Sequence, residues 1–302
     1  MGTVLAAADV GSNTVHLLVA DVNGLPIRRI LNESVWVSLG EEVSRIGSIS
    51  DEREAQIIRT LNDFKSRARS AKATRMYVFG TEALRRARNS ADVLRRVLTQ
   101  TGIPIDVIDS QREIQLSLQG ALLDTTAPAP LAFFEIGGGS AQVAQFNGYR
   151  IDHCHSLPIG TGSLIAAAGL SQPCRSEAID RAEEVVRAAT QPVATDGRVL
   201  AAIASGGVAR GLVRALHHDG ARDIHLEELE YLIWAVARLD VNAIMQRFLV
   251  KEKRASTLLP GAIVYRALLR RFGLTQMLVS EYGVREGALL EMREGAIEGW
   301  PA

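Results

Sequence analysis

Two short glycine-bearing turns have residues that could bind phosphate, and each follows an apolar run that ends in a carboxylate. The first is AAADVGSNT at residues 6–14, and the second is FFEIGGGSA at residues 133–141. Glycine lets the backbone turn tightly and brings main-chain N–H groups close to an anion. The preceding carboxylates, Asp9 and Glu135, could hold a divalent cation such as Mg²⁺ through oxygen.

The pairing of the turns predicts a phosphate cradle that is made twice. The backbone N–H groups expected to form it belong to Gly11, Ser12, Asn13, Gly137, Gly138, Gly139 and Ser140. One copy would be weak evidence, because Asp before Gly is common in ordinary turns and Asp9 could simply cap one. Two copies 126 positions apart (135 minus 9) are much less expected by chance.

Composition favours a two-domain protein without a global charge signal. The length of 302 residues indicates about two domains, and the 47% apolar content can fill a core in each. The 34 basic and 34 acidic residues balance, so we expect no nucleic-acid partner and no membrane surface, and any anion site must be local. No apolar run reaches the roughly 20 residues of a membrane span, so we expect a soluble, cytoplasmic protein.

The order of apolar segments repeats, which predicts an α/β fold with two mixed sheets flanked by helices. In the first half, strands are expected at residues 3–9, 15–22, 28–39, 75–80 and 103–109, and helices near 51–70, 90–101 and 112–123. This order is βββαβαβα. After the segment TTAPAP at 125–130, strands are expected at 131–136, 141–147, 149–157, 199–205 and 277–283, and helical segments at 161–190, from 208, at 225–272 and from 285.

These segments predict an N-terminal domain at 1–124 and a C-terminal domain at 131–284. The closing helix at 285–302 could join the first domain, and the helical insertion at about 225–272 belongs to the second. We expect a cleft between the domains that would bring the two glycine turns together, and small ligands usually bind in such clefts.

Several ordered segments carry a resemblance to a known family. They are DVGSNTVHLLVADV (9–22), GTEALRRARN (80–89), DSQREIQLSLQGA (109–121), EIGGGSAQV (135–143), LPIGTGSL (157–164), ASGGVARGL (204–212), LLPGAIV (258–264) and SEYGVREGALL (280–290). Together they resemble the exopolyphosphatase and guanosine pentaphosphate phosphohydrolase (Ppx/GppA) family, within the actin, sugar kinase and Hsp70 ATPase superfamily. The length matches the short family form, which consists of two ribonuclease H-like domains.

The resemblance implies a phosphoanhydride hydrolase that removes the terminal phosphate of inorganic polyphosphate. It also implies guanosine pentaphosphate as a second substrate and guanosine penta- or tetraphosphate as a binding partner. It makes Glu113 the general base for the attacking water and Arg85 a phosphate contact. It also implies Mg²⁺ or Mn²⁺ at Asp9 and Glu135, a monovalent cation such as K⁺, and a homodimer.

Each assignment has a simpler alternative. Arg85 could be one of several solvated arginines, and Glu113 an ordinary acid in the first turn of a helix. The segment with Ser205, Gly206 and Gly207 could be only a strand-to-helix turn, although a helix start also binds phosphate well. The arginines Arg266, Arg270 and Arg271 are expected on a solvated helix face rather than along a polyanion track.

Three residues depart from the family pattern and make the expected pocket less acidic. Glu135 replaces the usual Asp, Gln142 replaces a Glu, and Arg112 replaces the Glu before the catalytic residue. Weaker Mg²⁺ binding is the expected consequence of Gln142. Arg112 beside Glu113 would favour the ionised carboxylate.

Three functions remain open from the sequence. The first is the exopolyphosphatase, and the second is a weakly active or non-catalytic regulatory protein that binds polyphosphate or guanosine alarmones. The third is an ATP-using kinase or ATPase of the same superfamily, since fold does not fix function. Against the third, Glu113 is placed to activate water and the ASGGVARG segment is short for an adenosine pocket.

Overall fold

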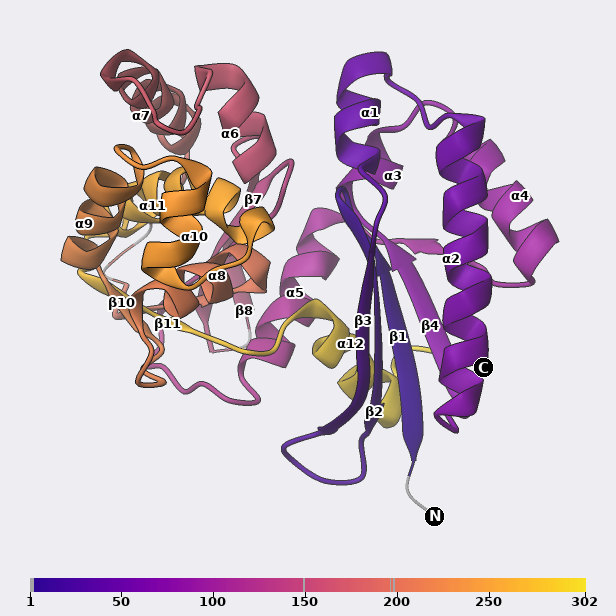
Figure 1. Ribbon diagram of the computed structural model, residues 1–302. Helices are drawn as coiled ribbons and strands as arrows, with labels where there is room; N and C mark the ends of the chain where they lie inside the picture. The colour runs from indigo at the N-terminus through magenta and orange to yellow at the C-terminus, as the bar shows by residue number, and fades with distance from the viewer. Residues whose placement is uncertain (1–2, 149, 196, 198) are drawn as a thin grey trace. The chain divides into compact units, whose positions relative to one another are not determined.

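Two mixed β-sheets, each flanked by helices, organise the chain in the computed structural model, which describes residues 3–148, 150–195, 197 and 199–302 (Figure 1). One unit comprises Met1–Leu123 together with Tyr282–Ala302, and the other comprises Asp124–Glu281. This architecture confirms the predicted fold class. The expected cleft between domains stays a prediction.

The sheet of the first unit has the strand order β12-β4-β1-β2-β3, with β5 added beside β4. Its strands are β1 (Val4–Val10), β2 (Thr14–Asp21), β3 (Arg28–Trp36), β4 (Arg75–Gly80), β5 (Asp106–Val107) and β12 (Trp300–Pro301). Strands β1, β4 and β5 are parallel, whereas β2 and β3 run antiparallel to their neighbours. The carboxyl ends of the three parallel strands therefore share one edge, where ligands commonly bind in α/β proteins.

Helices cover both faces of this sheet. They are α1 (Leu39–Ile46), α2 (Asp51–Ser70), α3 (Glu82–Arg86), α4 (Ser90–Thr101), α5 (Ser110–Ala121) and α12 (Val284–Glu294). Because side chains alternate along a strand, Ala6 and Ala8 of β1 pack into one core with α2 and α4 residues, whereas Leu5 and Ala7 pack into another with α5 and α12 residues. Successive side chains of β1 therefore point alternately toward the two layers of helices.

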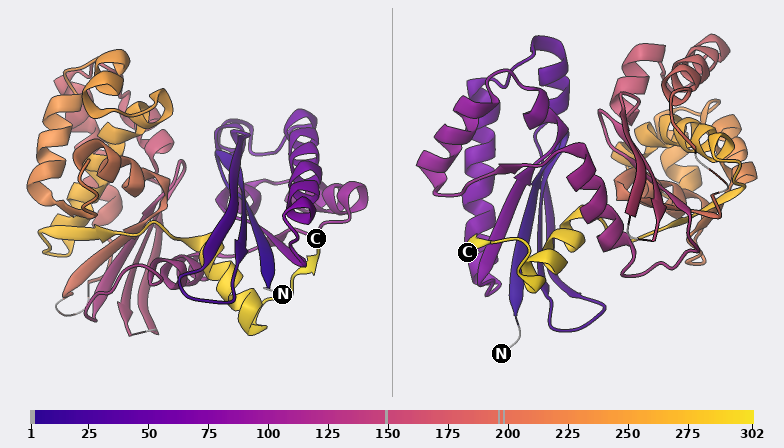
Figure 2. Two further views of the ribbon diagram at one scale, coloured as in Figure 1. Left: turned by 60° about the horizontal axis from the view of Figure 1, so that its bottom comes forward. Right: turned by 180° about the vertical axis from the view of Figure 1, so that it is seen from behind.

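Helices α5 and α12 lie side by side and approach very closely (Figure 2). A Cβ atom at Gly120 would lie 2.0 Å from the carbonyl oxygen of Gly283, and one at Gly287 would lie 1.9 Å from that of Leu116. Neither backbone atom can yield as a flexible side chain would. The two glycines therefore set the position of α5, which carries Glu113.

We expect Gly287→Ala to lower the free energy of unfolding by about 1–3 kcal/mol or more, because the added methyl on α12 would clash with the backbone of α5. Urea denaturation of the purified protein measures this change. Gly24→Ala is the matched control, since a Cβ there would meet nothing within 4 Å. Equal stability of the two variants would show that α5 and α12 separate at little cost.

The sheet of the second unit has the order β10-β11-β9-β6-β7-β8. Its strands are β6 (Leu131–Ile136), β7 (Ala141–Asn147), β8 (Arg150–Leu157), β9 (Ala201–Ser205), β10 (Asp223–His225) and β11 (Gln276–Val279). Its helices are α6 (Thr161–Ala168), α7 (Ser176–Thr190), α8 (Gly206–Leu216), α9 (Leu226–Val236), α10 (Val241–Phe248) and α11 (Glu252–Arg271). One large apolar core joins Phe134 of β6 with Leu212 of α8 and Leu268 of α11.

The structure corrects several predicted elements. The strand expected at 28–39 ends at Trp36, because the N–H groups of Val37 and Ser38 donate to the carbonyl of Asn13 and α1 follows. The strand expected at 103–109 is reduced to β5, and Pro104 has no N–H to add to a ladder. The predicted helical segment at 161–190 is two helices, α6 and α7, and α1, α3, β10 and β12 were not predicted.

Within the described part of the chain, no helix has both the length and the apolar character that a membrane crossing requires.

Candidate active site

Three predicted site residues follow parallel strands of the first sheet. Asp9 lies near the end of β1, Arg85 lies in α3 after β4, and Glu113 lies in the first turn of α5 after β5. The Asp109 side chain caps α5 by accepting a 2.7 Å hydrogen bond from the backbone N–H of Arg112. Because the carboxyl ends of β1, β4 and β5 share one edge, the fold gathers these residues at that edge.

The structure pairs the two candidate catalytic side chains directly. Both Nη atoms of Arg85 lie 3.0 Å from Oε2 of Glu113, and Nη1 also donates to the Ile108 carbonyl at 2.6 Å. The two side chains are only 20% and 18% exposed. A guanidinium has five N–H donors, so Arg85 keeps donors for an anion while it orients the carboxylate.

The expected influence of Arg112 on Glu113 stays a prediction, and the structure shows the direct partner of Arg112. Arg112 instead pairs with Glu291 of α12, with a 2.9 Å hydrogen bond from Nη1 to Oε1, and Arg85 supplies the positive charge beside Glu113. Neighbouring residues on a helix do not face one another. Arg112 therefore ties α5 to α12, and the arginine hydrogen-bonded to Glu113 comes from another helix, α3.

The carbonyl groups of the second glycine turn are held by the start of α6. The carbonyls of Gly137, Gly138 and Gly139 accept hydrogen bonds at 2.9, 2.8 and 3.2 Å from the N–H groups of Thr161, Gly162 and Gly160, respectively. The Ser163 hydroxyl adds a 2.8 Å bond to the carbonyl of Gly139. The peptide groups of the turn are thus fixed in orientation by hydrogen bonds.

This orientation leaves a row of N–H groups for an anion. In a trans peptide the N–H points opposite to the carbonyl, so the N–H groups of Gly138, Gly139 and Ser140 point away from α6. Successive backbone N–H groups in such a turn form an anion-binding concavity. Gly137 departs from expectation, because its N–H donates to the Ser140 carbonyl at 2.8 Å and closes the turn.

The first glycine turn is built in the same way against the start of α1. The N–H of Gly11 donates to the Thr14 carbonyl at 3.1 Å, so it too closes the turn instead of facing an anion. The carbonyl of Ser12 accepts a 2.6 Å bond from the N–H of Gly40, which turns the N–H of Asn13 away from α1. Both units therefore use a helix start to fix the turn.

Two glycines that the sequence interpretation did not assign make this arrangement possible. A Cβ at Gly40 would lie 2.7 Å from the Ser12 Cβ, and a Cβ at Gly160 would lie 2.5 Å from both the Gly139 carbonyl carbon and the Ser140 nitrogen. The sequence contains one signal, because each of these two glycines comes directly after an apolar residue in the segment that follows the third strand of its unit. The signal can be interpreted only when the structure shows that the helix start contacts the glycine turn.

Glu135, Gln142 and Ser205 lie side by side on three neighbouring strands, because Glu135 pairs with both of the others in register. The Ser205 hydroxyl donates to Oε2 of Glu135 at 3.1 Å, so this predicted phosphate contact is bonded to the carboxylate in the structure. Gly206 has φ of +90°, and a Cβ there would lie 3.1 Å from the Glu135 Cγ. Gly206 therefore makes room for the Glu135 side chain.

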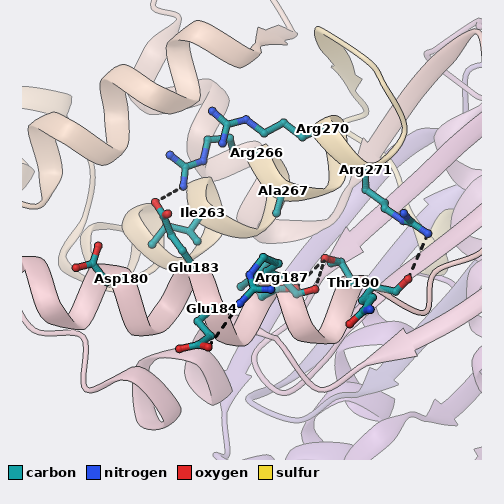
Figure 3. A pocket seen from close by; sticks show the side chains of 12 residues that line it. Asp180, Glu183, Glu184, Arg187, Thr190, Ile263, Arg266, Ala267, Arg270 and Arg271 are labelled. Carbon is teal, nitrogen blue, oxygen red and sulfur yellow. Dashed lines mark hydrogen bonds and ion pairs between the residues drawn. The ribbon is translucent and has the colours of Figure 1, made fainter.

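A separate pocket of about 860 Å³ lies between α7 and α11 (Figure 3). Arg266 pairs with Glu183 at 2.5 Å, Arg270 pairs with Glu230 at 2.5 Å, and Arg271 donates to the backbone carbonyls of Gln191 and Val193. Each of these three arginines joins two segments of the fold, so its contacts give it a structural role.

The fold and the site define a class of protein: two ribonuclease H-like α/β units, each with a glycine turn after a strand that carries a carboxylate. The chain belongs to the Ppx/GppA phosphatase family, whose model matches residues 18–295. This confirms the resemblance found in the sequence.

Relatives and solved structures agree over nearly the whole chain. Exopolyphosphatase 1 of Mycobacterium leprae is 26% identical over 309 residues, which cover 98% of this chain and 91% of that protein. Exopolyphosphatase 2 of Mycobacterium tuberculosis is 27% identical over 324 residues, covering 96% and 98%. The crystal structure of the Aquifex aeolicus Ppx/GppA phosphatase, type II variant, has a TM-score of 0.81 at 25% identity and covers 96% of this chain and 99% of its own.

Proposed function

We propose that this protein is an exopolyphosphatase, which hydrolyses the terminal phosphate of inorganic polyphosphate. The observation that carries the proposal is the Arg85–Glu113 pair at the sheet edge where β1, with Asp9 near its end, finishes. A phosphoryl transfer to water needs a base for the water and positive charge for the phosphoryl oxygens, and this pair offers both. The exopolyphosphatase names of two relatives support the same substrate.

In the proposed reaction, a water molecule attacks the terminal phosphorus and Glu113 accepts its proton. The bridging P–O bond breaks, and the products are orthophosphate and a chain that is one phosphate shorter. Arg85 holds Glu113 in place and directs remaining donors to phosphoryl oxygens. The N–H groups of Gly138, Gly139 and Ser140 provide a further site for phosphate oxygens in the second unit.

Mg²⁺ is the cation that we propose for the carboxylates of Asp9 and Glu135. Within the described residues, no three His, Cys, Asp or Glu side chains form a complete metal site alone. Mg²⁺ commonly takes one or two carboxylates and completes its shell with water and substrate phosphates, so Asp9 and Glu135 are suitable ligands. A bound Mg²⁺ would neutralise negative charge on the phosphoryl oxygens.

Gln142→Glu is expected to lower the Mg²⁺ concentration needed for half-maximal phosphate release several-fold. Gln142 is 4% exposed, its Oε1 has no hydrogen-bond partner among the described atoms, and it lies beside Glu135. Two adjacent carboxylates repel unless a cation lies between them. The variant should therefore unfold at a lower temperature in EDTA and regain stability with Mg²⁺.

Gln145→Glu is the matched control for this prediction. Gln145 is 1% exposed on the same strand but, three residues on from Gln142, faces the opposite side of the sheet. It should lose stability without recovery by Mg²⁺. If Gln142→Glu leaves the Mg²⁺ requirement unchanged, Gln142 has no role at the cation site.

Phosphate release from polyphosphate tests the proposal, with guanosine pentaphosphate as a second substrate because its terminal phosphoanhydride is chemically equivalent. Release from polyphosphate by the wild-type protein is expected. Tight binding of polyphosphate or guanosine tetraphosphate without any release would instead support the regulatory function. Turnover of ATP without polyphosphate hydrolysis would favour the kinase or ATPase.

A further inference from the structure

Arg254, in the first turn of α11, is held in a slot on α8 that two glycines create. Its Nη1 donates to the Gly207 carbonyl at 2.7 Å. A Cβ at Gly207 would lie 3.0 Å from that Nη1, and a Cβ at Gly211 would lie 3.2 Å from the Arg254 Cδ. The missing side chains at both positions let the guanidinium lie against the first turns of α8.

Two further arginines, Arg210 and Arg214, belong to α8 and lie near enough to Arg254 for their charges to affect it. Burial lowers the pKa of Arg254, and the positive charges of Arg210 and Arg214 lower it further. The hydrogen bonds of Arg254 and Arg210 go to the backbone carbonyls of Gly207 and Glu281, which carry no net charge. The α7 and α11 pocket differs, because Arg266 and Arg270 there each face a glutamate. The α8 cluster thus gathers positive charge that an anion would neutralise.

The slot that holds Arg254 lies at the same sheet edge as the second glycine turn, within the same unit. Strands β6 and β9 run parallel and pair Glu135 with Ser205, so their carboxyl ends share one edge. Glu135 leads into the turn of Gly138 and Gly139, and Ser205 leads into Gly207, whose carbonyl holds Arg254. A phosphate chain held at the turn would therefore have Arg254 at the same sheet edge, with Arg210 and Arg214 further along α8.

We propose that Arg210, Arg214 and Arg254 bind internal phosphates of the substrate chain, away from the phosphate that is cleaved, and so give a preference for long chains. This inference depends on the proposed exopolyphosphatase function. A single phosphate neutralises such a cluster incompletely, whereas a linear inorganic chain adds negative charge with each unit. Arginine also matches phosphate oxygens with paired donors.

Steady-state kinetics with tripolyphosphate and with long-chain polyphosphate test the proposal. Arg214→Gln and Arg254→Gln should each raise KM for the long chain about tenfold and leave kcat and the tripolyphosphate KM within about twofold. The long-chain KM should also become less sensitive to salt, because fewer charged contacts remain. Arg187→Gln is the control, since this 76% exposed arginine pairs with Glu184 outside the cluster.

Three outcomes would overturn the assignment. One is a wild-type KM for long chains in both variants, and another is an equal loss with both substrates. A KM increase limited to guanosine pentaphosphate would also overturn it, since the cluster would then serve a nucleotide. Because Arg254 packs in its slot, the melting temperature of each variant is measured, and Arg254→Lys should keep much of the long-chain affinity.

Failure of the proposed function has a different signature. If the wild-type protein releases no phosphate from either chain, the exopolyphosphatase proposal fails. Binding of long-chain polyphosphate to Glu113→Gln, measured by calorimetry with and without Arg214→Gln, still tests the cluster. Tenfold weaker binding in the double variant supports the cluster, and equal binding contradicts it.

Discussion

Glu113→Gln is expected to lower kcat for phosphate release by about 10²- to 10⁴-fold, the usual contribution of a general base. The amide keeps the size of the side chain and can still accept a hydrogen bond from Arg85, but it cannot take a proton from water. The substrate KM should change little, because the backbone N–H groups of the turns remain. Release of orthophosphate from polyphosphate measures the effect.

Asp63→Asn is the control for Glu113→Gln. Asp63 also pairs with an arginine, Arg67, at 2.8 Å, but it is 52% exposed on α2. Its replacement should leave activity unchanged. Wild-type kcat in Glu113→Gln would remove this carboxylate from the mechanism, and the base would then have to be sought elsewhere along the edge that Asp9 and Arg85 share.

Gly160→Ala is expected to lower kcat/KM by about 10²-fold, because a misplacement of roughly 1 Å at a positioning group can have an effect of that size. The new methyl would lie 2.5 Å from the Gly139 carbonyl carbon and from the Ser140 nitrogen. The turn must move away from α6, and its three aligned N–H groups lose their orientation. Kinetics on polyphosphate and the affinity for inorganic phosphate report the loss.

The unfolding midpoint separates a local from a global effect of Gly160→Ala. The variant should remain folded by circular dichroism while its stabilisation by added phosphate decreases. Gly24→Ala, where nothing lies within 4 Å of the new methyl, should behave as wild type in both assays. Unchanged phosphate stabilisation in Gly160→Ala would mean that the turn 137–140 does not bind phosphate.

Local patterns predicted most of the regular elements. The helix at Asp51–Ser70 and the strands at Arg75–Gly80, Leu131–Ile136 and Ala141–Asn147 coincide with the predicted ranges, because alternation and capping are visible within a few residues. Helix α3 has only five residues, and the N–H of Thr81 before it donates to the Val10 carbonyl of another strand. Such a short helix depends on a contact that no local pattern contains.

The sequence by itself determined the chemistry that is available: a carboxylate and a glycine turn made twice, a glutamate in the first turn of a helix, and the order of strands that positions them. Only the tertiary structure decided that Arg85 pairs with Glu113 while Arg112 pairs with Glu291, and which turn N–H groups face away from the helix starts. The physical reason is that charge pairing and peptide orientation depend on contacts between segments far apart in the chain, whereas strand period and turn composition are local.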